Sequence, residues 1–399
     1  MHYSYTEQGQ LSGITYQQSE QDNESIQSLM TRQYNAAGLV IQQTLGNGIE
    51  LTQQFDVFSR LAEQKWQSEQ KNFSELRTYQ YDNKHQLLNV CSVSGNTDEK
   101  ATKLKKKAFT YNSISQLLNT TITTEPVAQT SDTQATIKVS QEQYQWDAFG
   151  NPLNVKEDNV DNQATAQTVD TENVVRPNFS AQEPKAYANN EIKVENDRLL
   201  SFLGTDYRYD GSGNQLTSLA KGEHQQRSFN GLNQLKSINI NGQLTHYEYD
   251  ALGRRSAKIT EQGRIDFIWD ENQVIGEHFK GQFTWYIYQP NTFEPIALIK
   301  NVSSAKNHEI YYYHLDQLGT PLCLTNSKTQ QVWRNESDAF GYHQEGHFDA
   351  QVTDNQSDTK VTVNLISNPL RFQGQYFDEE SKLHYNRFRY YCPKQQRFI

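Results

Sequence analysis

Between residues 207 and 269 an aromatic residue is followed by Asp or Asn at a constant interval of 20 residues. The four pairs are Tyr209-Asp210, Phe229-Asn230, Tyr249-Asp250 and Trp269-Asp270. A fixed period of this length is typical of repeat proteins, in which each unit buries its faces only against its neighbours. The spacing therefore predicts one continuous repetitive object rather than several globular domains.

The clearest unit covers residues 246–255. Tyr247 and Tyr249 are two residues apart, so both rings point to one face if this segment is a strand. Asp250 can bond the backbone of a turn, and Gly253 can adopt a positive φ without steric cost. Because polar and apolar residues then alternate, we expect a returning strand. Each unit is predicted to be strand, turn, strand.

Similar units occur outside the regular block. A glycine stands three residues after the polar residue at Gly9, Gly38, Gly150, Gly213, Gly319 and Gly341. Other copies have Ser59, His85, Ser115, Asn233 and Gln273 at this place. Asn and His tolerate the left-handed region better than most residues, so the serines and Gln273 are the weaker matches.

The composition also favours a thin sheet. Only 35% of the residues are hydrophobic and 12% are aromatic, and the mean hydropathy is −0.86. A thick core would need more aliphatic residues. We expect a single curved sheet, wetted on both faces and stabilised by many cross-strand aromatic pairs.

Several functional classes are disfavoured. The net charge of −10 argues against nucleic acid as the main partner. No apolar run is long enough to span a membrane, and residues 1–5 have no signal-peptide character. Three scattered cysteines are typical of reduced, isolated thiols in a reducing cytosol. No metal-ligand spacing or phosphate-binding loop is present, so neither a metal nor a cofactor is expected.

Polar inserts are predicted near residues 97–107, 123–140, 156–195 and 343–367. The lysine run that ends at Lys107 fits either an anion-binding patch or a solvated loop, and we favour the loop. A hairpin is expected around residues 289–291.

Three places invite a catalytic interpretation. His314 and Asp316 could act as a base and the group that orients it, but Asp316 to Gly319 is also one more repeat turn, which we favour. Asp378, Glu379 and Glu380 could supply a carboxylate pair, although neighbours on a strand point to opposite faces and this run fits a turn.

Cys392 could be a nucleophile, since it looks exposed beside Pro393, but no nearby residue other than His384 could activate it. The arginines Arg371, Arg387 and Arg389 are expected to pair with carboxylates or to stack on tyrosine rings.

The aromatic-Asp units resemble the YD repeats of the bacterial Rhs family, which also occur in the C subunits of insecticidal Tc toxins. Residues 311–321 resemble that family's Tyr-x-x-His-x-Asp-x-x-Gly-Thr-Pro element, and residues 368–378 and 383–391 resemble its Rhs-associated core. The positions that carry the core resemblance are His314, Asp316, Gly319, Pro321, Arg371, Phe372, Gly374, Tyr385, Asn386, Arg387 and Tyr390.

The resemblance implies an all-β fold, in which a continuous spiral of antiparallel hairpins forms part of a hollow shell. In that family the shell encloses a toxic C-terminal domain, which an aspartate-dependent self-cleavage releases. Here Cys392 stands in place of the expected Asp, while Gln396 and Lys382 stand in place of glycines, so these turns should be strained or rebuilt. With Ile399 as the last residue, we expect that this chain carries neither the family's cleavage region nor its toxin.

We therefore predict a YD-repeat shell in residues 1–300 and a core-like segment in residues 301–399. The predicted function is a non-catalytic scaffold that encapsulates a toxin, encoded elsewhere or lost, in contact-dependent competition. It would be made in the bacterial cytoplasm and exported without a signal peptide. A surface protein that binds cell-wall glycans and a non-functional gene remnant stay open as alternatives. Free strand edges of an open, partial shell predict self-association, and secretion-apparatus proteins are possible partners.

Overall fold

The computed structural model describes residues 1–20, 23–68, 73–95, 103–126, 137–160, 192–301, 308–342, 351–353, 360–362 and 366–399. Within these ranges every regular element is a β-strand, which confirms the all-β prediction. No helix of the described residues could cross a membrane.

Two long antiparallel sheets form the wall of the molecule. The first consists of β1 (His2–Tyr5), β2 (Leu11–Glu20), β3 (Asn23–Tyr34), β4 (Val40–Leu45), β5 (Ile49–Phe55), β6 (Leu61–Ser68), β7 (Ser74–Tyr81), β8 (Leu87–Gly95), β9 (Lys103–Tyr111), β10 (Leu117–Pro126), β11 (Lys138–Trp146) and β12 (Pro152–Val160). The second consists of β13 (Lys193–Glu195), β14 (Arg198–Phe202), β15 (Thr205–Tyr209), β16 (Gln215–Ala220), β17 (Glu223–Phe229), β18 (Leu235–Ile240), β19 (Gln243–Tyr249), β20 (Arg255–Thr260), β21 (Gly263–Asp270), β22 (Gln273–Phe279), β23 (Gln282–Tyr288), β24 (Pro295–Asn301), β25 (His308–Leu315), β26 (Pro321–Thr325) and β27 (Gln331–Arg334).

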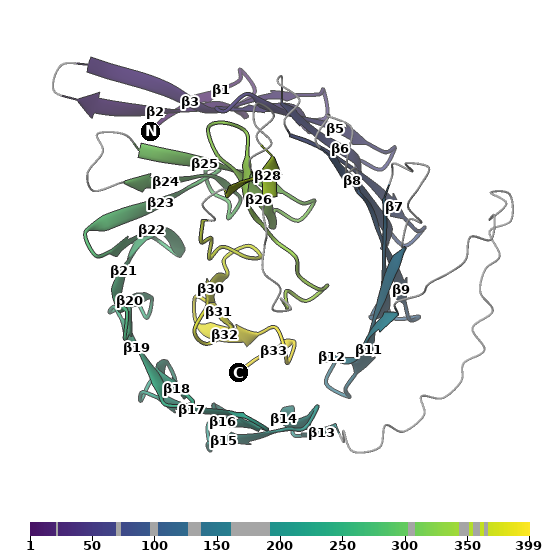
Figure 1. Ribbon diagram of the computed structural model, residues 1–399, viewed down its shortest axis with the longest axis vertical. Coiled ribbons are helices and arrows are strands. Elements are labelled where there is room, and N and C mark those ends of the chain that lie inside the picture. The colour runs from purple at the N-terminus through teal and green to yellow at the C-terminus, as the bar shows by residue number, and fades with distance from the viewer. Residues whose placement is uncertain are drawn as a thin grey trace, which may run out of the picture.

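In both sheets each strand pairs with its neighbours in sequence. The strands thus succeed one another around a closed path, which Figure 1 shows as a ring seen end on. No strand of the first sheet pairs with a strand of the second among the described residues, since the first sheet ends at β12 and the second begins at β13. The repeat therefore produces a wall, as the period predicts.

Most repeat turns are closed in the same way. In the unit at Asp250, Oδ1 accepts the backbone N–H of Leu252 at 2.9 Å and that of Arg254 at 2.8 Å. The N–H of Gly253 donates to the Asp250 carbonyl at 2.9 Å. The same two side-chain bonds occur at Asn35, Asp56, Asp82, Asn112, Asp147, Asn230, Asp316, Asn326 and Asp338. The predicted repeat turn is confirmed, and the unit at Asn326, which lacks the aromatic residue, is an additional copy.

The residue three positions after the Asp or Asn of this turn adopts a positive φ whether or not it is glycine. Gly253 has a φ of 73°, and the values at Ser59, His85, Ser115 and Asn233 are 61°, 65°, 70° and 59°. The prediction for Gln273 is wrong. Asp270 pairs directly with Gln273 across a two-residue turn, and Glu271 takes the positive φ of 45° there.

The aromatic residue of a unit ties that unit to the one before it. Tyr249 donates its hydroxyl to the carbonyl of Leu235 at 2.8 Å, and Trp269 donates Nε1–H to the carbonyl of Arg255 at 2.8 Å. The other donors are Tyr34, Tyr81, Tyr111, Trp146, Tyr209 and Tyr288, which reach Leu11, Leu61, Leu87, Leu117, Leu199 and Val274. Wherever the aromatic residue is one of these Tyr or Trp residues, a polar atom of the ring therefore makes a contact between units, which Phe55 and Phe229 cannot make.

The ring closes by overlap. The end of the second sheet lies inside the beginning of the first (Figure 1), and a buried core between them includes Ile14, Met30, Ile49, Ile299 and Tyr312. The Asn47 side chain donates to the Thr325 hydroxyl and to the Asn326 carbonyl, both at 2.9 Å. The expected open ring is therefore closed around its axis by sheet-on-sheet packing.

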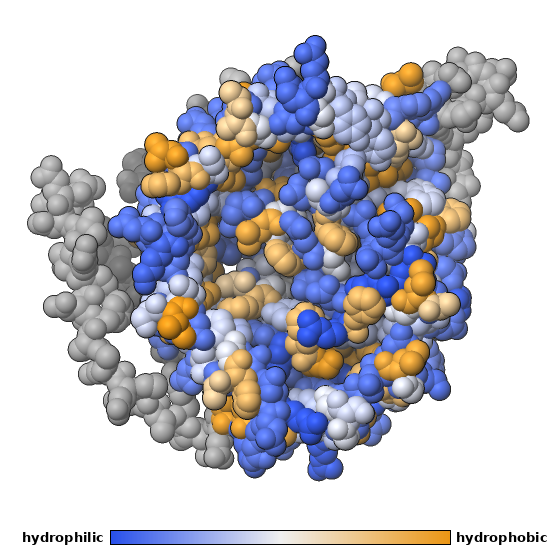
Figure 2. Space-filling model, turned by 180° about the vertical axis from the view of Figure 1, so that it is seen from behind, coloured by the Kyte–Doolittle hydropathy of each residue, from blue (hydrophilic) through white to orange (hydrophobic). Residues whose placement is uncertain are grey.

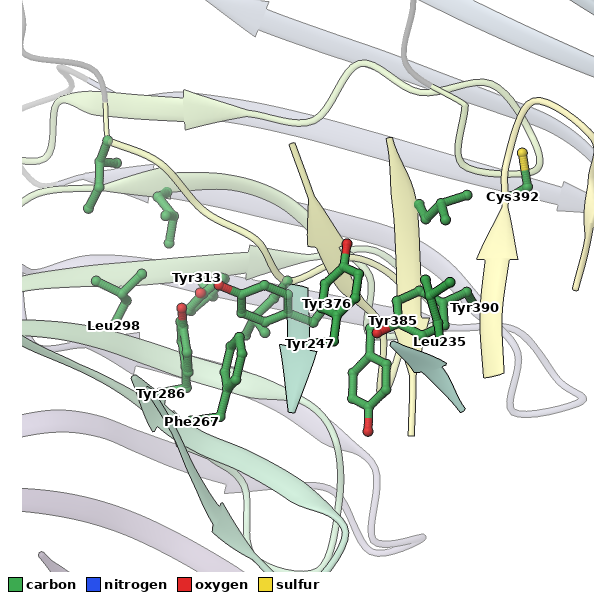
Figure 3. Packing of buried hydrophobic residues seen from close by; sticks show 14 of the residues in the cluster. Leu235, Tyr247, Phe267, Tyr286, Leu298, Tyr313, Tyr376, Tyr385, Tyr390 and Cys392 are labelled. Carbon is green, nitrogen blue, oxygen red and sulfur yellow. The ribbon is translucent and has the colours of Figure 1, made fainter. Parts of the chain in front are cut away.

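The C-terminal segment lies inside the ring. It carries β30 (Tyr376–Asp378), β31 (Leu383–Asn386), β32 (Arg389–Cys392) and β33 (Arg397–Phe398), which form a small sheet. Figure 3 shows Tyr376, Tyr385 and Tyr390 of this segment facing wall residues such as Tyr247 and Phe267, all members of one buried cluster. Figure 2 shows that the molecule is hollowed elsewhere between the wall and the interior.

The expectation of a sheet with two wet faces is therefore wrong at the overlap and beneath the C-terminal segment. The predicted loop is also wrong for the lysine run, because residues 103–107 belong to β9. Strands β10 to β13 likewise occupy the ends of the inserts predicted near 123–140 and 156–195.

Residues 96–102, 127–136 and 161–191, which cover parts of the first three predicted inserts, lie outside the described residues. In the insert near 343–367, β28 (Gln351–Thr353) pairs with β29 (Lys360–Thr362). The hairpin around residues 289–291 is confirmed by the pairing of β23 with β24. The division of the chain at residue 300 stays a prediction.

Candidate functional site

Four charged residues hold the C-terminal segment to the wall, and we call them the anchor cluster. Arg255 forms a two-pronged ion pair with Asp378, with Nη1 at 2.5 Å from Oδ2 and Nη2 at 3.0 Å from Oδ1. Lys258 Nζ lies 3.2 Å from Asp378 and 3.1 Å from Glu380. Arg255 and Lys258 come from β20, whereas Asp378 ends β30, so the cluster joins residues more than a hundred positions apart.

Aromatic rings surround the arginine of this cluster. The guanidinium carbon of Arg255 lies 4.4 Å from the Tyr385 ring centre and 4.6 Å from that of Phe267. Tyr247, Tyr376 and Tyr390 lie at 5.3, 5.2 and 6.0 Å. Cation–π contacts of this kind are strongest when water is excluded, and Arg255 is 0% exposed.

The charges of the anchor cluster depend on one another. Burial would raise the pKa of Asp378, but the Arg255 and Lys258 cations overcome it and hold the pKa below its ordinary value. Burial and the charge of Asp378 raise the pKa of Glu380. An ionised carboxylate that is saturated by two cations is a structural tie rather than a general base.

Backbone and hydroxyl contacts complete the attachment. Tyr385 accepts the backbone N–H of Arg255 on its hydroxyl at 2.9 Å, and the hydroxyls of Tyr249 and Tyr390 lie 3.0 Å apart. At the far end Arg397 Nη2 lies 3.2 Å from Asp147 of the first sheet. The segment is therefore fixed to both sheets.

A second charged network, here called the closure network, joins the overlapping sheets. Glu75 of β7 pairs with Arg77 at 2.7 Å and with Arg334 of β27 at 3.0 Å. Glu336 pairs with Arg334 at 3.2 Å and with Lys105 of β9 at 2.6 Å. Burial alone would raise the pKa of Glu75, but the Arg77 and Arg334 cations outweigh it and hold that pKa at about 2. Lys105, Arg77 and Arg334 of the wall thus help to hold the ring closed.

His314 and Asp316 do not form a catalytic pair. His314 is buried between the sheets, with Nε2 at 2.9 Å from the Thr325 hydroxyl and its ring 4.9 Å from that of Phe73, and burial lowers its pKa to about 4. Asp316 instead accepts the N–H groups of Leu318 and Thr320 at 2.8 Å each. Both residues have the structural places that we favoured.

The remaining core positions have varied places. Gly319 and Gly374 have φ values of 76° and 78°, Pro321 begins β26, and Asn386 ends β31. Phe372 is 47% exposed. In the first repeat block Tyr209, Asp210 and Gly213 form a turn like that at Asp250, with Asn214 N–H donating to Asp210 at 2.9 Å.

Cys392 is buried, contrary to the expectation that it is exposed, and burial raises the pKa of its thiol. A buried neutral thiol is a poor nucleophile. Arg371 lies 4.5 Å from the Phe377 ring and Arg389 lies 3.6 Å from that of Phe398. Arg387 lies 4.1 Å from the Phe388 ring, and Arg371 also lies 5.5 Å from that of Trp333. The three arginines were expected to pair with carboxylates or to stack on tyrosine, and instead they stack on phenylalanine and tryptophan.

Arg255, Lys258, Glu75 and Arg334 were missed as site residues. The available signal was their inward-facing position in a wall strand, since a charged residue there must find a partner. The partner itself could not be identified from local sequence.

Two family models match parts of the chain. The model described as RHS Repeat matches residues 229–265 and the model described as RHS protein matches residues 310–346. Toxin protein Tse5 of Pseudomonas aeruginosa is 27% identical over 294 residues, which cover 64% of this chain and 21% of that protein. Double-stranded DNA deaminase toxin A of Burkholderia cenocepacia is 28% identical over 233 residues, which cover 52% of this chain and 16% of the relative.

Among solved structures, the crystal structure of TcdB2-TccC3-Cdc42 matches with a TM-score of 0.69 and 18% identity, over 99% of this chain and 19% of that one. The wall and its enclosed segment thus have the architecture of an Rhs shell. The chain is an RHS/YD-repeat protein related to Rhs toxins. It spans about a fifth of the length of the relatives just named.

Proposed function

We propose that this chain is a non-catalytic wall that encloses a toxin polypeptide in contact-dependent bacterial competition. The observation that carries the proposal is the position of residues 366–399 inside the ring, where the anchor cluster and Arg397 hold them (Figure 1). A polypeptide joined to residue 399 would start within the wall. The match to the shell region of Rhs toxins supports this role.

The protein would be made in the bacterial cytoplasm and exported by a contact-dependent route, as expected for a relative of named toxins. Glycan binding has less support, because all five tryptophans are at least partly buried and, among the described tyrosines, those counted as exposed are Tyr3 and Tyr5 of β1. Binding modules for sugars present aromatic faces to solvent.

Protection from proteolysis tests enclosure. One specific protease site is added after Ile399, and the same site is inserted beside Val57, which is 92% exposed. The interior site should be cut on the order of ten times more slowly, since cleavage there requires opening of the ring. Equal cleavage rates at the two sites would contradict enclosure.

Self-association is part of the same proposal. β1 is paired on one side only, by β2, and all four of its residues are exposed. It has no charged Lys, Asp or Glu that would discourage pairing with another strand. Light scattering should show oligomers, and a purely monomeric species would exclude this part of the proposal. The related TccC3 has been crystallised with TcdB2, so a second protein could cover the edge instead.

A further inference from the structure

A small pocket lies between the wall and the C-terminal segment. Trp269 and Tyr288 contribute to it from the wall, and Arg371, Gly374 and Arg387 contribute from the segment. Its free volume is about 30 Å³. This volume holds about two waters, or the head group of a small anion.

Arg371 lines this pocket, and its guanidinium carbon lies 4.5 Å from the Phe377 ring centre and 5.5 Å from that of Trp333. It is 8% exposed, and its Nη1 donates to the carbonyls of Asn368 at 2.7 Å and Leu370 at 3.0 Å. Its Nε is buried and has no acceptor in the protein. Across the described residues no carboxylate forms a salt bridge with Arg371, and burial lowers its pKa to about 10.

Arg387 brings a second cation. It stands in the hairpin turn between β31 and β32 with a φ of 56°. Its Nε donates to Asn272 Oδ1 at 2.8 Å, and its Nη2 donates to the Leu252 carbonyl at 3.1 Å. Its Nη1 is buried without an acceptor. In the part of the chain that the structure describes, this arginine also has no salt bridge.

Arg371 is buried, whereas Arg387 is partly exposed. A buried charge without a salt bridge, such as that of Arg371, is unusual because buried charges are ordinarily paired. Arg255, whose carbonyl accepts the Nε1–H of Trp269, is paired in this way with Asp378. The described residues that line the pocket include no Asp or Glu, although the chain carries 47 acidic residues. Hydrogen bonds to carbonyls satisfy donors of both arginines, and Glu379 attracts Arg371 only through space, without a salt bridge.

We propose that this pocket binds one small oxyanion, with the planar carboxylate group as the best-matched chemistry. A guanidinium presents its donors in a planar fork that fits a carboxylate. The aromatic walls would exclude water and strengthen the attraction. The carboxylate can belong to a free anion or to an acidic side chain of a bound polypeptide, and the volume admits little beyond the head group.

Equilibrium dialysis of the full chain with radiolabelled formate tests the proposal. Because formate has only three heavy atoms, its Kd should be no tighter than on the order of 1 mM. We expect saturable binding of one formate per chain. Arg387→Met should weaken binding by at least about tenfold, and Arg387→Lys, which keeps the charge, should weaken it less. Arg389→Met is the matched control, because Arg389 is exposed and outside the pocket, and it should bind like the unaltered chain.

Competition distinguishes the two sources of the carboxylate. A short amidated peptide with one Glu should displace formate if side chains are accepted, and failure to do so restricts the site to free anions. Non-saturable formate binding, or equal binding by Arg387→Met and Arg389→Met, would overturn the proposal. If Arg387→Met does not fold, the stoichiometry of the unaltered chain and the Arg387→Lys variant still decide.

Discussion

Removal of Asp378 is the sharpest perturbation that the anchor cluster offers. Asp378→Ala would leave the guanidinium of Arg255 and the ammonium of Lys258 in a site where all three side chains are at most 7% exposed. Breaking one side of a buried ion pair typically costs about 3–5 kcal/mol. We expect a loss of this size in the free energy of unfolding.

Asp266 provides a matched control. It accepts Arg264 Nε at 2.6 Å, but both side chains are 45% exposed. An exposed pair contributes about 0–1 kcal/mol, so Asp266→Ala should have a small effect. The double variant Arg255→Met, Asp378→Leu removes both partner charges and should recover part of the loss, although Lys258 then retains only Glu380.

Urea unfolding followed by tryptophan fluorescence measures these differences through the midpoint and the slope. The reasoning fails if Asp378→Ala loses no more stability than Asp266→Ala. It also fails if the double variant is less stable than Asp378→Ala, because uncompensated charge would then not be the source of the loss.

The other predictions concern single turns and ties. Burial, with the charge of Glu142 adding to it, raises the pKa of Asp338 to about 7, so the contribution of protonated Asp338 to stability is fully present below about pH 4 and is lost as the pH rises through 7. In urea titrations the free energy of unfolding of Asp338→Asn should therefore rise relative to that of the unaltered chain by roughly 1 kcal/mol per pH unit in that window. A difference that stays constant with pH would contradict this. Lys382 has a φ of 57°, so Lys382→Gly should raise the melting temperature through relief of up to about 1 kcal/mol of strain, whereas Glu379→Gly, at a position without positive φ, should lower it. Tyr249→Phe removes the hydroxyl that reaches Leu235 and should cost about 1 kcal/mol in urea unfolding, and an unchanged midpoint would show that the ring alone makes the tie.

The local part of this fold is predictable because its causes are local. The interval between Asp250 and Gly253 defines a turn that the two residues build themselves, and Ser59 adopts the same conformation without glycine. The prediction for Gln273 was wrong because a two-residue turn that includes Glu271 also connects β21 to β22. The conformation at these positions depends only on residues within one hairpin.

The candidate site was less predictable because its partners are distant. Arg255 lies 123 residues from Asp378, and no local pattern relates them. Lys105 reads as part of a solvated run, yet it pairs with Glu336 across the overlap. Which strands overlap depends on how far the wall curves over its whole length, and that is a cumulative property of many small twists.

The order in which the layers lie has a consequence for biosynthesis. The strands that a ribosome would deliver first, β2 to β8, end outside β24 to β27, which emerge much later. The early sheet must therefore wait with its apolar inner side uncovered until the later strands arrive to fill it. Slow translation or a chaperone that shields that side should therefore raise the yield of folded protein.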